Sequence, residues 1–145
     1  MKYFTKKWYL NGCVDKPIIE DENYFDYDTS IHDLKIINTI QKHGDFTIMF
    51  EDNDIWCNYS KIVFYDSEII KNINLIGAYC LADEIYIRND YIEYHLLIWS
   101  ENISDYNNLG YFTIKSKKIL FYSSNNQKSA PILSGNFFEI KNTTR

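Results

Sequence analysis

Cysteine is scarce in this chain of 145 residues, where it occurs only at Cys13, Cys57 and Cys80. Three is an odd number, and the wide spacings match neither a disulfide framework nor the paired C-x-x-C ligands of a zinc site. No histidine or basic residue adjoins Cys57 or Cys80 to favour a reactive thiolate. These absences exclude a disulfide-stapled fold and are typical of a protein of the reducing cytoplasm.

Long apolar runs are missing as well. No window approaches the roughly 18 apolar residues that cross a membrane as a helix. Between the basic Lys7 and Cys13, the apolar stretch is only Trp8-Tyr9-Leu10, which is too short for the core of a secretion signal. We therefore expect a cytoplasmic protein without a membrane partner.

Positive charge is in deficit, with 15 Lys and Arg against 20 Asp and Glu and a net charge of −5 at pH 7. An acidic protein repels polyanions unless a basic patch opposes the effect. A small basic run, Lys115, Lys117 and Lys118, is interpreted as the solvated edge of a sheet that discourages sheet-to-sheet association. We expect no nucleic-acid partner.

Glycine and proline are rare, with five and two residues respectively. Gly77 and Gly110 stand alone, so no glycine series is present that could cradle a phosphate group, and Ser134-Gly135 lacks a G-x-S-x-G elbow. What the chain has instead is 46% hydrophobic and 17% aromatic residues, a composition typical of a folded protein. Its length suits a single domain over residues 1–145.

Three regions can be distinguished by composition. Residues 1–10 are aromatic and basic, with a spacing that predicts a short helix. Residues 11–30 are acidic and contain Pro17, which indicates an irregular connection. Residues 31–145 are rich in β-branched and aromatic residues and predict a β body, although residues 66–75 also fit a helical turn. The fold class is mainly β, with α+β as the alternative, in an antiparallel sandwich or partial barrel of about six or more strands.

Two hairpins and a faint repeat can be read from the β body. Turns at His43-Gly44 and Asn89-Asp90 each separate two apolar runs. The segment 60–67 resembles 116–123 with one residue inserted, which suggests two β-β-β units. A two-residue loop at Asn89-Asp90 predicts one apolar face and one polar face, with the opposing pairs Ile87 and Ile92, Ile85 and Tyr94, Tyr86 and Glu93, and Glu84 and His95.

Several short motifs together resemble a known family. They are, in order, Met1-Lys2-Tyr3-Phe4-Thr5-Lys6, His32-Asp33 before Leu34-Lys35-Ile36, Gly77-Ala78, Asp83-Glu84-Ile85-Tyr86 and Tyr94-His95-Leu96-Leu97. This order is similar to that of an uncharacterised bacterial family built around a domain of unknown function, over most of residues 1–122. Members of that family carry a helical region where this chain has about twenty irregular residues. The resemblance implies a bacterial cytoplasmic protein with a β-rich C-terminal body, implies no activity, and marks as motif positions His32, Asp33, Asp83, Glu84 and His95.

One candidate function is catalytic. The imidazoles of His32 and His95 with the carboxylates of Asp33 and Glu84 could bind a transition metal or act as general acid and base in a hydrolytic enzyme. No H-x-H or H-E-x-x-H spacing fixes these residues locally. The structural alternative is that His32 and Asp33 cap the first strand while Glu84 and His95 pair across two strands. We favour that alternative, and expect no cofactor and no tightly held metal.

The favoured function is protein binding without catalysis. The chain has thirteen tyrosines, an excess of residues whose ring can be buried while the hydroxyl contacts water. An AT-rich coding genome would also raise their number. Tyr24, Phe25, Asp26, Tyr27 and Asp28 combine aromatic anchors with acidic groups in the irregular connection. The sequence therefore predicts a non-enzymatic binding module, of the immunity type as one concrete form, that recognises a basic protein. It leaves the oligomeric state and the enzyme alternative open.

Overall fold

The computed structural model describes residues 19–26, 29, 31–52, 59–101 and 109–123. In these ranges the chain forms strands and connections, which confirms the mainly β prediction, and it contains no helix of the length and apolarity that crossing a membrane requires. The helix predicted over residues 1–10 lies outside the described residues. The strands are β1 (Ile36–Lys42), β2 (Asp45–Phe50), β3 (Tyr59–Lys71), β4 (Tyr79–Ile87), β5 (Ile92–Trp99) and β6 (Gly110–Ser123).

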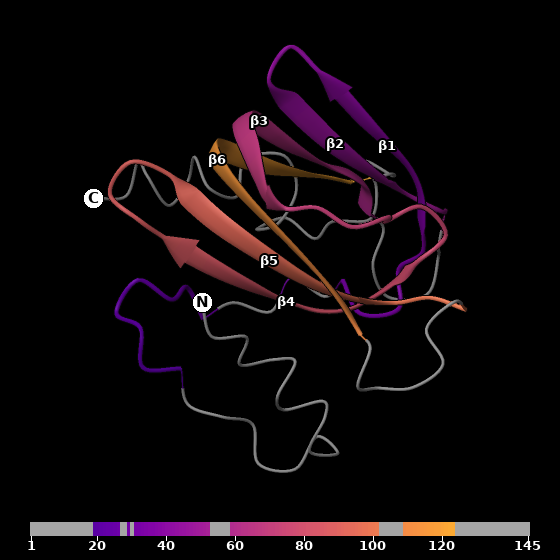
Figure 1. Ribbon diagram of the computed structural model, residues 1–145, viewed down its shortest axis with the longest axis horizontal. Coiled ribbons are helices and arrows are strands. Elements are labelled where there is room, and N and C mark those ends of the chain that lie inside the picture. Colours follow the sequence, from indigo (N-terminus) through magenta and orange to yellow (C-terminus); the bar gives the residue numbers. More distant parts are fainter. Residues whose placement is uncertain (1–18, 27–28, 30, 53–58, 102–108, 124–145) are drawn as a thin grey trace.

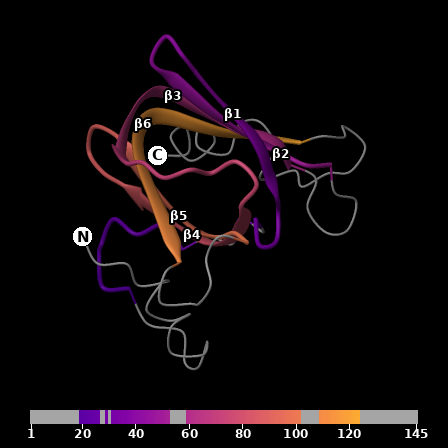
Figure 2. The ribbon, with the colours of Figure 1, turned by 45° about the vertical axis from the view of Figure 1, so that its right-hand side comes forward.

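All six strands belong to one antiparallel sheet, in the order β1-β2-β3-β6-β5-β4. Each half of the sheet is a three-strand meander, and the third strands of the two halves, β3 and β6, pair in the middle (Figure 1). Two β-β-β units are therefore present, as the sequence suggested. The sheet curls over but does not close into a barrel (Figure 2).

The first hairpin follows directly from its sequence. His43 and Gly44 have φ angles of 53° and 85°, the left-handed conformation that a two-residue hairpin turn needs to match the strand twist. In β2, Phe46, Ile48 and Phe50 are buried and alternate with half-buried residues. This period of two places one face of the hairpin on the core.

The second hairpin has the predicted register. The Arg88 N–H donates to the Tyr91 C=O across the Asn89-Asp90 turn, at 2.9 Å. The confirmed Cα partners are Ile87 and Ile92, Tyr86 and Glu93, Ile85 and Tyr94, and Glu84 and His95. Since successive side chains point to opposite faces, Glu84 and His95 lie on the face away from Ile85 and Tyr94.

The long strands β3 and β6 pair so that the two similar segments lie opposite each other. Val63 is the partner of Leu120, and the pairs Ile62–Phe121 and Phe64–Ile119 flank it symmetrically. The likeness between segments 60–67 and 116–123 thus coincides with a local two-fold axis through the Val63–Leu120 pair. This symmetry does not extend to the neighbouring strands, because β2 pairs with residues 61–64 of β3 whereas β5 pairs with residues 110–116 of β6.

The interpretation of the β6 lysines as a sheet edge is wrong for Lys115, which has a strand partner on each side, Glu68 of β3 and Glu93 of β5. Beyond Ser116, β6 pairs with β3 and no longer with β5. There the Lys118 Nζ lies 5.5 Å from the ring centroid of Tyr65, and the Lys61 Nζ of β3 lies 4.9 Å from that of Tyr122. The hydroxyls of Tyr65 and Tyr122 share a hydrogen bond of 2.8 Å. The basic side chains therefore reinforce the middle of the sheet through cation–π contacts.

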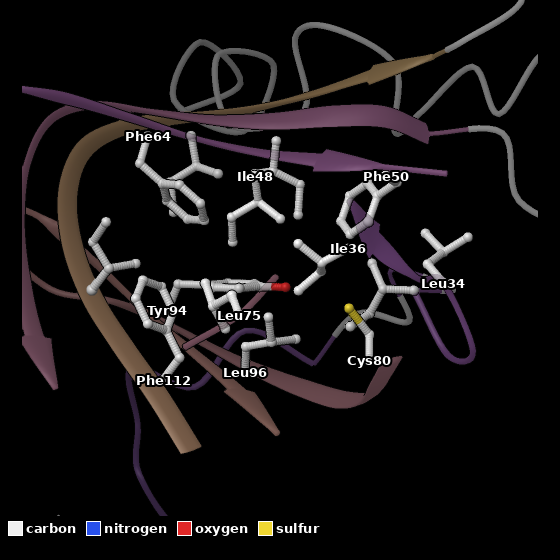
Figure 3. Close-up of a cluster of buried hydrophobic side chains, with 14 of the residues drawn as sticks. Leu34, Ile36, Ile48, Phe50, Phe64, Leu75, Cys80, Tyr94, Leu96 and Phe112 are labelled. Carbon is white, nitrogen blue, oxygen red and sulfur yellow. The ribbon is translucent and has the colours of Figure 1, made fainter. Parts of the chain in front are cut away.

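The hydrophobic core lies between the two halves of the curled sheet. Figure 3 shows Ile48 and Phe64 of the first half facing Leu96 and Phe112 of the second, with Tyr94 between them. β6 bends from one layer into the other, so a single sheet encloses the core on both sides (Figure 3). All five of these side chains have no solvent-exposed surface.

The two edges of the sheet meet along a short seam. Four backbone hydrogen bonds of 2.7–2.8 Å join residues 33–36, before and at the start of β1, to residues 77–80 around the start of β4. Gly77, which has a φ of 87°, turns the chain into this seam. Residues 66–71, which also fitted a helical turn in the sequence, continue β3 as strand.

We predict that truncating a side chain of this sheet lowers the free energy of unfolding more when that side chain is more deeply buried. Ile48→Ala should lower the free energy of unfolding by about 3 kcal/mol, because the side chain is fully buried. Ile40→Ala, in the paired strand, should change it by no more than about 0.5 kcal/mol, because Ile40 is 45% exposed. Urea denaturation followed by tryptophan fluorescence measures both. Equal costs for the two variants would contradict the described packing.

Candidate functional site

A set of polar side chains is buried on the face of β4, β5 and β6 that points away from the core. We call it the His95 cluster, and its members are Glu84, Tyr86, Glu93, His95, Tyr111 and Thr113. Each of these residues is at most 8% exposed. Buried carboxylates and imidazoles destabilise a fold unless they are paired and hydrogen-bonded, so the contacts within the cluster decide what it can do.

The His95 ring is hydrogen-bonded at both nitrogens. Nε2 lies 2.5 Å from Glu93 Oε2, and since a carboxylate accepts, this nitrogen carries the proton. The Thr113 hydroxyl then donates to Nδ1 at 3.1 Å. Burial lowers the pKa of His95, against the opposing effect of Glu93, so the neutral imidazole is favoured. Tyr86 meets the ring edge-on, with centroids 5.5 Å apart.

Glu84 accepts hydrogen bonds from two tyrosines. The hydroxyls of Tyr86 and Tyr111 each lie 3.2 Å from Glu84 Oε1. Burial raises the pKa of Tyr86 far above its usual range, and the Glu84 carboxylate adds to the shift. Tyr86 therefore stays protonated and keeps donating to Glu84.

Arg88 connects the cluster to the acidic segment. Its Nε lies 3.4 Å from Glu93 Oε1, and its Nη1 contacts both oxygens of Asp21 at 3.1 and 3.0 Å. The guanidinium also stacks on Tyr86, 4.9 Å from the ring centroid. The pKa of Asp21 is lowered by the backbone N–H of Asn23 and, against a burial effect, by Arg88. One cation thus serves two carboxylates and one aromatic ring.

The order Thr113, His95, Glu93 is that of a hydroxyl, an imidazole and a carboxylate, the groups of a hydrolytic triad. The His95 ring has no exposed surface and Thr113 has 4%. A nucleophile needs room for a substrate beside it, and these side chains present almost no surface to one. The contacts fit a polar network that fixes three strands against one another.

His32 and Asp33 lie elsewhere, in an exposed turn before β1. Their side chains are 54% and 53% exposed, and His32 Nε2 lies 3.4 Å from Asp33 Oδ1. His32 Nδ1 donates to the Leu81 C=O at 2.8 Å. Leu81 lies at a register shift in β4, and His32 adds a side-chain hydrogen bond to its carbonyl there.

Asp83 belongs to the opposite face from the His95 cluster. Its Oδ2 accepts hydrogen bonds from the Thr29 hydroxyl at 2.6 Å and from the Tyr94 hydroxyl at 2.8 Å. Of the five motif positions, the structure therefore brings only Glu84 and His95 onto one face. Glu93 and Thr113, the closest partners of His95, were not among the predicted site residues.

Metal ligands do not converge within the described ranges: no group of three or more His, Cys, Asp or Glu side chains is arranged to hold an ion there. Cys80 is a buried thiol in the hydrophobic core, which agrees with its interpretation as a small apolar residue.

The acidic segment is anchored along β4. Tyr24 forms an antiparallel bridge with Tyr86, the Phe25 N–H donates to the Ile85 C=O, and the Ile87 N–H donates to the Asn23 C=O. Phe25 packs against the core, and the pKa of Tyr24 is raised to about 12 by burial, with Asp26 adding to it. Both aromatics therefore hold the segment in place, while Asp26 is exposed. Tyr27 and Asp28 lie outside the described residues.

Comparison with protein-family models, curated proteins and solved structures gives no match to this chain. The resemblance to an uncharacterised bacterial family stays a prediction.

We predict that His95 makes stability depend on pH. Because its pKa is lowered in the folded state, the unfolded chain binds the proton first, so its contribution is complete above about pH 6.5 and is lost as pH falls toward the folded pKa. Between about pH 7.5 and 5.5 the wild type should lose roughly 1 kcal/mol more unfolding free energy than His95→Gln. Urea denaturation at each pH measures this difference.

The matched control is His32→Gln, which removes an exposed histidine on another part of the surface. It should keep the wild-type pH dependence, since His95 remains. If the His95→Gln and wild-type curves ran parallel, the buried imidazole would not carry the effect.

Proposed function

We propose that this protein is a non-enzymatic binding module of the bacterial cytoplasm, of the immunity type, that recognises a basic protein through its acidic segment. The observation that carries the proposal is the pairing of residues 23–25 of this segment with the edge of β4. A segment held in one conformation loses little entropy when a partner binds, which favours affinity.

Local turns add to this fixation. The Asp21 carboxylate accepts from the Asn23 N–H at 2.9 Å, and the Tyr24 N–H donates to the Asp21 C=O at 3.0 Å. Arg88 holds Asp21 from the other side. The segment is therefore tied to β4 both by backbone pairing and by a charge-assisted contact.

Three carboxylates project from this anchored segment, at Glu20, Glu22 and Asp26. All three residues are exposed, and none takes part in an ion pair with another described residue. The neighbouring Asp21 is compensated by Arg88. Uncompensated charges of one sign raise the rate at which an oppositely charged partner associates.

The separation of the histidines favours this proposal over the enzyme alternative. His32 and Asp33 lie in an exposed turn, whereas Glu84 and His95 are buried on one face of the sheet. A metal-assisted or hydrolytic mechanism that uses all four needs them around one substrate.

We predict that neutralising the three exposed carboxylates slows association. The variant Glu20→Gln/Glu22→Gln/Asp26→Asn should lower the association rate of the partner by about tenfold at about 0.05 M salt, with little change in the dissociation rate. At about 0.5 M salt the wild type and the variant should bind alike, because screening removes the difference. Pull-down from the native cytoplasm identifies the partner, and surface plasmon resonance measures the rates.

The matched control is Glu51→Gln/Asp52→Asn/Asp90→Asn, which makes the same change in net charge at other exposed positions. It should reduce the association rate much less than the segment variant does. A partner whose binding ignores salt, or responds equally to both triple variants, would contradict recognition by this segment. Tyr24→Ala and Phe25→Ala are unsuitable as probes, because both side chains pack within the fold.

A further inference from the structure

A concave site lies where the seam ends, and it is separate from both the His95 cluster and the acidic segment. This seam pocket has a volume of about 470 Å³. The volume falls within the range of about 300–1,000 Å³ that holds small organic ligands. Its lining comes from the residue before β1, the connection between β3 and β4, the start of β4, the end of β5 with the two residues after it, and the start of β6. The lining residues are Lys35, Ile73, Asn74, Ile76, Gly77, Tyr79, Ile98, Ser100, Glu101 and Gly110.

Apolar side chains form one wall of the pocket. Ile73, Ile98 and Tyr79 line it, and Ile76, which is 52% exposed, extends the apolar surface to the outside. Gly110 lets Ile73 and Ile98 pack directly on its backbone, because a Cβ there would come within 2.8 Å of Ile73 Cδ1 and 2.9 Å of Ile98 Cγ1. The seam pocket therefore offers a ligand an apolar wall beside its polar groups.

Lys35 supplies a cation at this wall. Its Nζ lies 5.7 Å from the centroid of the Tyr79 ring, and the two residues form the isolated bridge that joins the sheet edges. Within the described part of the chain, no carboxylate forms an ion pair with Lys35. Lys35 is half-buried as a residue, and its ammonium lies over an aromatic ring, so it is a ready partner for an anion.

Glu101 is the opposing charge in the lining. It is exposed, so water and salt screen it more strongly than they screen the half-buried Lys35. The balance of the lining therefore favours an anion over a cation, and Asn74 and Ser100 add neutral hydrogen-bonding groups.

We propose that the seam pocket binds a small amphipathic carboxylate, with its apolar chain against Ile73, Ile76 and Ile98 and its carboxylate on Lys35. The site is independent of the proposed protein-binding segment, since residues 23–25 pair with residues 85–87 at the other end of β4. A negative result for ligand binding in the seam pocket would therefore not contradict the proposed protein binding, and the reverse also holds.

The test compares three probes of similar length, namely hexanoate, hexylamine and hexanol, by titration of the full chain followed with ¹H–¹⁵N NMR. A ligand of this size should bind with a dissociation constant in the millimolar range. Hexanoate should shift the backbone signals of residues 73–79 and 98–101 in a saturable manner. Hexylamine and hexanol should bind at least about fivefold more weakly than hexanoate. Equal affinity for the three probes, or shifts that never saturate, would overturn the assignment.

Two substitutions with opposite expected effects locate the carboxylate. Lys35→Gln should weaken hexanoate binding by about fivefold, and Glu101→Gln should strengthen it by about twofold. The matched control Lys42→Gln removes an exposed lysine from the far end of β1 and should leave the affinity unchanged. Equal effects of Lys35→Gln and Lys42→Gln would show that only net charge matters and would overturn the site. Dispersed amide spectra establish that each variant is folded.

Discussion

The antiparallel ladder between β3 and β6 is the interaction on which the rest of the structure depends. Among the described residues, it joins two three-strand meanders that also contact each other through the core and the short seam. The paired residues are more than forty positions apart in the chain, so forming the ladder requires closure of a long loop before the contacts stabilise it. Once it forms, the bend of β6 folds one half of the sheet over the other and encloses the core (Figure 3).

The sequence predicts the hairpins and their register, which are local, but it does not predict the strand order that this ladder creates. Both hairpins, and the register from Glu84 to Ile92, follow from a two-residue turn and a period of two. The central position of β6 does not, because strand order depends on contacts between distant residues. The lysines of β6 were therefore assigned to a solvated edge, although Lys115 has a strand on each side and the pairing of β3 with β6 places Lys118 beside Tyr65.

The residues of the candidate site likewise fall into those that the local sequence predicts and those that depend on pairing between distant strands. That Glu84 is the partner of His95 was predictable from one hairpin, and Glu93, two residues before His95, shares its face for the same reason. Thr113 could not be found, since it reaches His95 only through the pairing of β5 with β6. His32 is separated from them because it caps a backbone carbonyl at the bulge of β4, a feature without a sequence signal.

The outer edge of β4 explains where the surface features lie. Residues 23–25 cover its end near Ile85, residues 33–36 cover its start near Cys80, and His32 bonds to Leu81 between them. An edge covered in this way offers no continuous row of backbone groups to another strand, which protects against edge-to-edge association. It also fixes the acidic segment and the seam pocket to opposite ends of one strand, roughly 20 Å apart at about 3.3 Å per residue.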